Sequence, residues 1–488
     1  MNSAVEQFDV LIIGAGISGI GAAHHLQEQC PDKRFCVLES KESYGGTWLL
    51  HKYPGIRSDS DMFTFGYRFK PWEDTPIASG EAILQYMGEV ISDANLDQHI
   101  RYNHQIVSAS WCSRDKNWTI IANTNGDTVE LKTRFLWMCQ GYYDHENPYT
   151  PQWQGMDAFN GEIVHPQHWP ETLDYSGKRI IVIGSGATAA TVVPALAGEA
   201  AHVTMLQRSP TYFYPRPNNN ELATQLRTLD VDPLWVHEIA RRQVLKEQYD
   251  VIKFCEEFPD VAKDELVKGV KEKLSDDYDV ERHFTPNYNP WRQRIAVAPE
   301  GDLFEGINSG KASVVTDEIE CFTEKGLLLK SGEELEADII VTATGFNISV
   351  MGGIEFAVDG QPVDFGETVN FRGMMFTGVP NMTWIMGYFR ASWTLRVDLI
   401  SDFVCRMLQH MDHIDADEVS VVLPEEDLNK PLRPWADSEV FNPGYLMRSM
   451  SLMPKRGPSD DWQLSQDYWE EREQLPKIDL GSATFKYA

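Results

Sequence analysis

The segment VLIIGAGISGIGAAHHL, residues 10–26, decides the fold. Its first four residues are apolar, as in a buried parallel strand, and a glycine-rich run and a stretch of helical periodicity follow them. In such a turn the first glycine makes the tight bend, the second lets a pyrophosphate approach the backbone, and the third lets the helix pack on the strand. The helix N-terminus would then face the phosphates. A dinucleotide site is therefore predicted at Gly14, Gly16, Ser18 and Gly19.

A second apolar strand is predicted at residues 35–38, and it ends in Glu39. An acidic side chain at this place, a little over 20 residues after the first glycine, is suited to bind ribose hydroxyls. Strand, glycine turn, helix and terminal acid together are far more specific than the glycine pattern alone. We therefore expect FAD at this site.

The same pattern recurs in RIIVIGSGATA, residues 179–189, with alanine in place of the third glycine. The next strand, Val203 to Leu206, ends in a cation and not in an acid. A cation at this point suits the 2′-phosphate of NADPH, although a lone arginine is more often a solvated surface charge. We predict that NADPH binds here and that the cofactor contacts come from Gly184, Ser185, Gly186, Thr188, Ala189, Gln207, Arg208 and Ser209.

Composition limits the alternatives. The 43 basic and 73 acidic side chains give a net charge of −30, which disfavours nucleic-acid and anionic-membrane partners. Seven scattered cysteines without a CxxC pair disfavour a metal site or a disulfide framework, so no metal is expected and reduced cytoplasmic thiols are the default. No secretory signal and no window of about 18 uncharged apolar residues is present. A cytoplasmic protein without a membrane span is predicted.

Two dinucleotide sites in one chain imply a flavoprotein that is reduced by a nicotinamide, because hydride passes between the two rings. A disulfide reductase of this architecture would carry a CxxxxC pair after its GGT sequence. Here GGT is followed by Trp48 and, five residues later, by Tyr53. Molecular oxygen is therefore the expected acceptor.

Two further segments resemble the fingerprints of the Baeyer-Villiger monooxygenases, a class of FAD- and NADPH-dependent flavoprotein monooxygenases. FNGEIVHPQHWP, residues 159–170, matches their FxGxxxHxxxW(P/D) pattern, and GGTWLLHKYPGIRSD, residues 45–59, matches a second one. Relatives that oxygenate nitrogen or sulfur usually have Phe or Tyr at the position of Trp169. Phrases such as LQRSPTY, YNPW and ASWTL are similar to the branch that acts on long aliphatic ketones and on thioamides or sulfides.

The resemblance implies a mechanism. Reduced flavin and oxygen form a flavin peroxide, whose anion attacks a ketone carbonyl, and a fixed cation in a water-poor pocket would stabilise both negatively charged species. The resemblance assigns that cation to Arg294 and its orienting partner to Asp59, which also lies beside the flavin. Thr47 and Trp48 are expected near the flavin, although Trp48 serves packing equally well.

Other residues have less direct roles. His165 lies on the linker of the fingerprint, so it is expected to form positional hydrogen bonds and not to transfer protons. Gln293 stands where better-known members have a lysine that helps to hold the 2′-phosphate, so selectivity for NADPH would depend more on Arg208.

The predicted fold class is α/β, with two Rossmann-like dinucleotide-binding domains, for FAD and NADPH, and a helical insertion. Residues 1–145 are expected to form the first part of the FAD domain and residues 146–210 the first part of the NADPH domain. Residues 211–291, rich in charge and helical periodicity, form the insertion, which either covers a tunnel or is a solvated excursion. Residues 292–346 complete the NADPH domain, and residues 347–488 complete the FAD domain, including a core helix that begins near Trp393.

The favoured function is a Baeyer-Villiger monooxygenase that uses NADPH and O2 to convert ketones to esters, with possible S-oxygenation. One alternative is an N- or S-hydroxylating flavin monooxygenase. Another is a non-catalytic sensor that binds flavin and NADPH. The sequence leaves open the natural substrate, the regiochemistry, the oligomeric state and the pathway.

Overall fold

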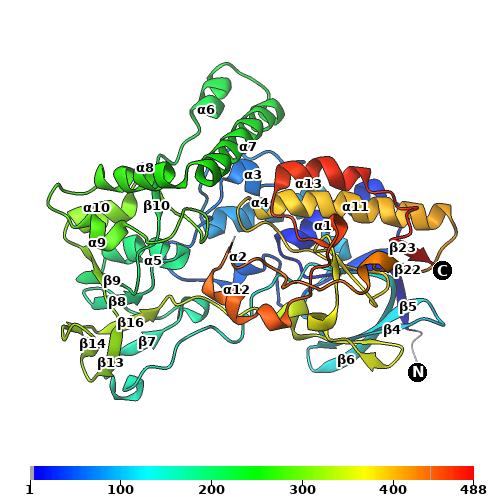
Figure 1. The fold of residues 1–488 in the computed structure, drawn as a ribbon, viewed down its shortest axis with the longest axis horizontal. Helices are drawn as coiled ribbons and strands as arrows, with labels where there is room; N and C mark the ends of the chain where they lie inside the picture. The colour runs from blue at the N-terminus through cyan, green and yellow to red at the C-terminus, as the bar shows by residue number, and fades with distance from the viewer. Residues whose placement is uncertain (1–4, 440) are drawn as a thin grey trace.

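The computed structural model describes residues 5–439 and 441–488, so the first four residues of the predicted FAD segment lie outside the described part. Figure 1 shows two sheet-containing halves side by side, with helices α6 and α7 projecting above them. Each half contains one of the two predicted glycine turns.

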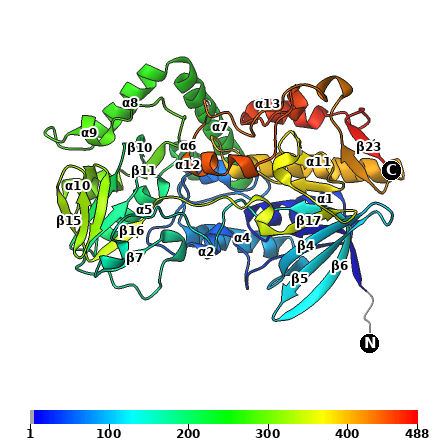
Figure 2. The same ribbon diagram turned by 60° about the horizontal axis from the view of Figure 1, so that its bottom comes forward.

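The first half is built on a large mixed sheet. Its central strand β1 (Glu6–Ile13) pairs in parallel with β2 (Phe35–Leu38) and β6 (Asp127–Met138). Beyond these lie the parallel strands β3 (Ile100–Arg101) and β21 (Met382–Trp384). An antiparallel meander of β4 (Gln105–Cys112), β5 (Asn117–Thr124) and β6 continues the sheet to β17 (Glu355–Val358) and β18 (Gln361–Pro362). The meander and its continuation are visible at the lower right of Figure 2.

Helices cover the parallel part of this sheet. Helix α1 (Ile17–Gln29) packs against α11 (Trp393–His413), which comes from the far end of the chain. Most of α11 is buried, and it begins at Trp393, as predicted. Helix α4 (Gly80–Asp93) begins where the Ser79 side chain accepts a hydrogen bond from the Ala82 N–H group. Other short helices of this half are α2 (Thr47–Leu50), α3 (Met62–Phe65), α12 (Gly444–Arg448) and α13 (Tyr468–Gln474).

The second half has an all-parallel sheet in the order β12-β9-β8-β16-β7. Most residues of its strands are apolar and buried, as expected for a sheet covered on both faces. Helices α5 (Ala187–Ala197) and α10 (Asp302–Asn308) pack on it, and a small antiparallel sheet joins it. The strands are β7 (Glu162–Val164), β8 (Arg179–Ile183), β9 (His202–Gln207), β12 (Ala312–Thr316) and β16 (Ile339–Thr342), with β13 (Ile319–Thr323), β14 (Gly326–Leu329) and β15 (Glu334–Glu336) in the small sheet.

A helical excursion interrupts the second half between two strands that pair in parallel, β10 (Phe213–Arg216) and β11 (Ala296–Pro299). It consists of α6 (Glu221–Thr228), α7 (Pro233–Glu257), α8 (Pro259–Lys271) and α9 (Val280–Phe284). Arg241 on α7 is buried and donates to the carbonyl oxygen of Phe63 at 2.9 Å, so the excursion is docked on the first half.

The predicted fold class is therefore confirmed: two Rossmann-like halves and a helical insertion are present. The four helices of the excursion fall within residues 211–291, the range predicted for the insertion.

Candidate active site

The first glycine turn is shaped as the sequence predicts. Gly14 has a φ of +102°, and a side chain at Gly19 would place its Cβ 1.8 Å from the carbonyl oxygen of Gly14. Gly16, in contrast, has no protein atom beyond its neighbours closer than the Cα of Gly46, 3.7 Å from an added Cβ. No side chain caps the N-terminus of α1, so its first N–H groups remain available to an anion. These features fit the pyrophosphate of FAD.

Other predicted FAD residues surround this turn. Glu39 is buried, and its carboxylate accepts hydrogen bonds from the backbone N–H groups of Ala15 at 2.7 Å and Lys41 at 2.9 Å. Ser18 accepts a hydrogen bond from the indole of Trp393 at 2.8 Å. Thr47 begins helix α2, directly after Gly45 and Gly46.

The second glycine turn repeats this geometry. Gly184 has a φ of +131°, and an added Cβ would lie 2.3 Å from the Ala343 carbonyl oxygen. Around Gly186 no atom lies within 4 Å of an added Cβ, and no side chain caps α5. The Ser185 hydroxyl lies 2.8 Å from the Thr211 hydroxyl, and Ala189 is fully buried. The turn thus offers an open, uncapped helix N-terminus to a second dinucleotide.

The residues after β9 differ in exposure. Arg208 and Ser209 are exposed at the end of the strand, as a phosphate-binding cation must be. Gln207 is buried, and its amide donates to the carbonyl oxygen of His283 at 2.7 Å, so its side chain ties the strand to the insertion. The assignment of these residues to cofactor binding remains a prediction.

The segment GGTWLLHKYPGIRSD connects the two halves. The Tyr53 side chain packs against the hydrophobic core of the second half. A Cβ at Gly55 would lie 2.7 Å from the Cβ of Ala195 on α5, which shows how closely the backbones approach. Arg57 forms an ion pair with Asp302 on α10 at 2.5 Å. The segment therefore carries its last residue, Asp59, to the junction between the halves.

At this junction Asp59 meets Arg294, although 235 positions separate them in the sequence. The guanidinium donates to the Asp59 carboxylate at 2.5 Å and, through Nε, to the Phe389 carbonyl oxygen at 3.4 Å. The Arg294 side chain is 41% exposed, so part of the guanidinium stays accessible beside Asp59. Partial burial acts to lower the pKa of Arg294, but the Asp59 carboxylate outweighs it, and the pKa is raised.

Aromatic side chains cluster next to Arg294, whose Nε–H group donates to the Phe389 carbonyl oxygen, and the Phe389 ring lies 6.1 Å from the Tyr142 ring. Tyr142 and Tyr143 follow β6, and their rings lie 4.7 Å apart. The Trp393 ring stacks on Tyr142 at 5.3 Å, and Tyr445 of α12 lies 6.4 Å from Tyr142. Helix α12 lies at the centre of Figure 1, between the two halves. Sequence reasoning missed these tyrosines, although a polar aromatic doublet at the carboxyl end of a parallel strand is a signal for a ligand site.

His165 has the positional role that was expected. Its Nε2–H group donates to the Gly345 carbonyl oxygen at 3.1 Å, and its Nδ1 accepts from the Gln167 N–H group at 3.1 Å. Both ring nitrogens are therefore held by backbone groups, and burial lowers the pKa of His165. Trp169 contacts Tyr175, and Trp48 contacts Phe65, both edge to face.

Two histidines that sequence reasoning missed lie next to the same junction. The rings of His51 and His145 are 5.8 Å apart, and His51 also stacks on Tyr143 at 6.2 Å. Burial lowers the pKa of each histidine to about 4. No hydrogen-bond partner for Nε2 of His51 or Nδ1 of His145 is found among the described residues. Both rings are therefore neutral near pH 7.

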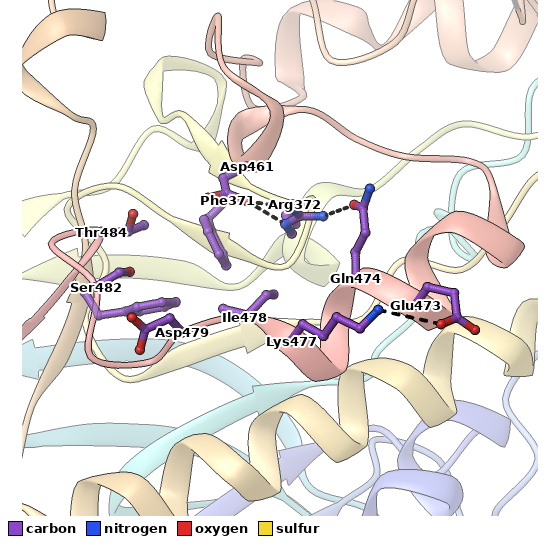
Figure 3. A pocket seen from close by; sticks show the side chains of 11 residues that line it. Phe371, Arg372, Asp461, Glu473, Gln474, Lys477, Ile478, Asp479, Ser482 and Thr484 are labelled. Atoms are coloured by element: carbon purple, nitrogen blue, oxygen red, sulfur yellow. Dashed lines mark hydrogen bonds and ion pairs between the residues drawn. The ribbon is translucent and has the colours of Figure 1, made fainter.

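A surface pocket of about 380 Å³ lies elsewhere, between β19 (Asn370–Phe371) and the C-terminal segment (Figure 3). Its Arg372 is held by Asp461 and Gln474, and its Lys477 pairs with Glu473. None of its lining residues contacts Arg294, so we place the chemistry at the junction. Over the residues described, no group of three or more His, Cys, Asp and Glu side chains could hold a metal ion.

Comparison with known proteins gives consistent results. Residues 11–227 match the family model described as pyridine nucleotide-disulphide oxidoreductase. The chain is 46% identical over 465 residues to the FAD-containing monooxygenase EthA of Mycobacterium tuberculosis, covering 95% of this chain and 94% of EthA. It is 43% identical to the probable FAD-binding monooxygenase AlmA of an Acinetobacter species, covering 99% and 96%.

Solved structures share the fold. A steroid monooxygenase bound to NADP superposes with a TM-score of 0.75 at 23% identity, covering 99% of both chains. A cyclohexanone monooxygenase gives 0.75 at 20% identity, covering 99% of this chain and all of that one. Within the described residues, no helix has the length and apolar character that crossing a bilayer requires.

Proposed function

Because this chain belongs to the family of FAD-containing monooxygenases, we propose that it is a Baeyer-Villiger monooxygenase that uses NADPH and O2 to convert ketones to esters. The membership confirms the resemblance identified from the sequence fingerprints. It also agrees with the cysteines, since all seven are free in the described residues and no CxxxxC pair stands directly after the GGT sequence. A reduced set of thiols suits the cytoplasm, which we propose as the location.

The observation that carries the proposal is the Arg294–Asp59 pair between the two glycine turns. The pair brings a cation from the second half to a carboxylate of the first. A cation held at such a junction stabilises negative charge at a point that both cofactor sites can reach. Arg294 pairs with the flavin-side segment at residues 45–59, whereas Arg57, which belongs to that segment, pairs with Asp302 on α10.

The residues of each turn fit their cofactor. Glu39 would hold the ribose and the N-terminus of α1 the pyrophosphate of FAD, while the N-terminus of α5 and Arg208 would hold NADPH. When bound, the flavin accepts hydride from NADPH and activates O2. The yellow colour of bound FAD in the purified protein checks the first assignment. Colourless protein that takes up no FAD would contradict it.

The protein side chains then act on the substrate. The N–H groups of Arg294 stabilise the negative charge that develops on the carbonyl oxygen as its carbon is attacked. Asp59 holds the guanidinium in place through one N–H group. The rings of Tyr142, Tyr445 and Trp393 exclude water, which strengthens every charge interaction in the site.

A panel of aliphatic ketones supplied with NADPH in air, with product analysis, tests the proposal. One ester formed per NADPH consumed is the expected result. Sulfoxides or hydroxylamines without any ester would instead indicate an N- or S-hydroxylating monooxygenase, and S-oxygenation beside ester formation fits the sulfide-acting branch. An absence of steady NADPH oxidation would indicate a non-catalytic sensor.

A further inference from the structure

Arg448, the last residue of α12, is a cation without an acidic partner. The chain has 73 acidic and 43 basic side chains, yet no ion pair of Arg448 is found among the residues that the structure describes. Its guanidinium donates to the Phe346 carbonyl oxygen at 3.0 Å and lies over the Tyr149 ring, 3.4 Å from the ring centroid. A guanidinium carries five N–H groups, so most donors of Arg448 have no acceptor in the described part of the chain.

Apolar residues of α12 fix the place of this cation. Leu446 is fully buried in the core of the first half, and the Tyr445 ring lies 4.3 Å from the Phe346 ring. Arg448 itself is exposed. Burial of part of its side chain lowers its pKa, which the Tyr149 phenol opposes, and a guanidinium stays charged at neutral pH despite such a shift. The first half therefore presents a fixed charge to the segment that follows β16.

The carbonyl that Arg448 holds belongs to the carboxyl end of the second sheet. Phe346 follows β16, which ends at Thr342 and pairs in parallel with β8. The Ala343 carbonyl oxygen would lie 2.3 Å from a Cβ added at Gly184, in the second glycine turn. Three residues span at most about 11 Å, so Phe346 lies within about that distance of Ala343. Arg448 thus reaches from the first half to the neighbourhood of the second turn.

The order of the strands sets the direction of a bound dinucleotide. Arg208 follows β9, the uncapped N-terminus of α5 follows β8, and β16 comes next in the sheet order β9-β8-β16. A nucleotide with its 2′-phosphate at Arg208 and its pyrophosphate at α5 therefore extends its nicotinamide half toward the end of β16. The backbone leaves room there, since Gly345 has a φ of +101° and no atom lies within 4 Å of an added Cβ.

We propose that Arg448 donates to the pyrophosphate of NADPH from the side of its nicotinamide half. The pyrophosphate is the anionic group on that side, and the parallel N–H groups of a guanidinium suit phosphate oxygens. The N-terminus of α5 supplies backbone N–H groups from the second half, while Arg448 supplies a full charge from the first half. The inference goes beyond the proposed function, because it concerns the binding of the nucleotide and not the reaction.

Titrations of the oxidised FAD-containing enzyme test this without turnover. NADP+ and NAD+ are added in separate experiments, and isothermal titration calorimetry gives a Kd for each. Arg448→Ala removes the guanidinium, and Arg448→Gln removes the charge but keeps an N–H donor for the Phe346 carbonyl oxygen. Arg456→Ala is the matched control, because Arg456 also donates to a backbone carbonyl oxygen, that of Pro434 at 2.7 Å, and forms no ion pair within the described residues.

Both Arg448 variants should raise the Kd of NADP+ and that of NAD+ about tenfold, the lower end for a charge-assisted hydrogen bond, because solvent reaches the side chain. The ratio of the two Kd values should match the wild type, since both nucleotides carry the pyrophosphate, whereas Arg208→Ala should change this ratio. The control should leave both Kd values unchanged. Unchanged Kd values in both Arg448 variants would overturn the inference, and Arg448 would then only dock α12 on Phe346. A loss for NADP+ alone would overturn it too, because the contact would be to the 2′-phosphate.

The ketone panel separates this inference from the proposed function. If the wild type makes ester but neither Kd depends on Arg448, the inference fails alone. If no ester forms although both Kd values depend on Arg448, the proposed function fails and the nucleotide contact stands.

Discussion

Replacing Arg294 by alanine should separate the two halves of catalysis. Hydride transfer requires only contact between the cofactors, whereas oxygen insertion requires positive charge at the attacked carbonyl. The substitution removes that charge and the three N–H groups that have no acceptor among the described residues. Flavin reduction should therefore continue, while ester formation nearly stops.

The structure sets the size of the effect. At about 4 Å and an effective dielectric constant of about 20, two unit charges interact by about 4 kcal/mol, equal to about a thousandfold in rate. The guanidinium is 41% exposed, which weakens its field, so the expected loss is about a hundredfold to a thousandfold. Asp59→Ala should cost less, about tenfold, because the cation remains but is no longer oriented.

The two steps are measured separately. Anaerobic bleaching of the flavin by NADPH reports reduction, and gas chromatography of aerobic reactions reports ester. Arg292→Ala is the control, because it also removes one positive charge, from an exposed side chain two positions away. If the Arg294 variant makes ester at a rate near that of the wild type, or if the Arg292 variant is equally impaired, the assignment of the cation is wrong.

Three further predictions concern the cofactor turns and the buried histidines. Arg208→Ala should reduce the preference for NADPH over NADH about tenfold to a hundredfold, which is the effect of losing one charge-assisted hydrogen bond. The ratio of kcat/KM for NADPH to kcat/KM for NADH measures this preference. If the ratio does not change, the 2′-phosphate binds elsewhere. Gly19→Ala should lose FAD, because its Cβ would lie 1.8 Å from the Gly14 carbonyl oxygen, whereas Gly198→Ala, with no atom within 4 Å, should keep it. Flavin content per chain distinguishes the two variants, and equal content contradicts the packing argument. The pKa of His51 is about 4 in the folded protein and near 6.5 unfolded, so the unfolded chain binds more protons between these values. The contribution of neutral His51 to the free energy of unfolding should therefore be complete above about pH 6.5 and should be lost as the pH falls toward 4. His51→Asn should make Tm depend less on pH in this range. If the slope of Tm against pH is the same in the variant, His51 is not a cause of the slope.

The parts of the fold that could be predicted are those that a short segment determines. Strand, glycine turn and helix at residues 10–26 depend on local apolar periodicity and on the backbone freedom of Gly14. The Arg294–Asp59 pair could be named only through a family resemblance, because no local rule joins residues 235 positions apart. The tyrosines next to Arg294, Tyr142, Tyr143 and Tyr445, could not be identified in this way. Tyr445 reaches Tyr142 only because α12 returns from the C-terminal part to the junction.

The backbone around Arg294 explains why its position depends on the assembled molecule. Arg294 lies in an irregular segment between α9 and β11, so no helix or strand fixes it. Trp291, three residues earlier, has a φ of +65°, which for a bulky side chain costs about 1 to 3 kcal/mol and persists only when surrounding contacts hold it. Those contacts come from the first half: Asp59, the Phe389 carbonyl oxygen, and the Asn442 N–H group, which donates to the Arg292 carbonyl oxygen at 3.0 Å. The cation is therefore held in place only while the two halves remain docked, which is also the condition under which both cofactors can reach it.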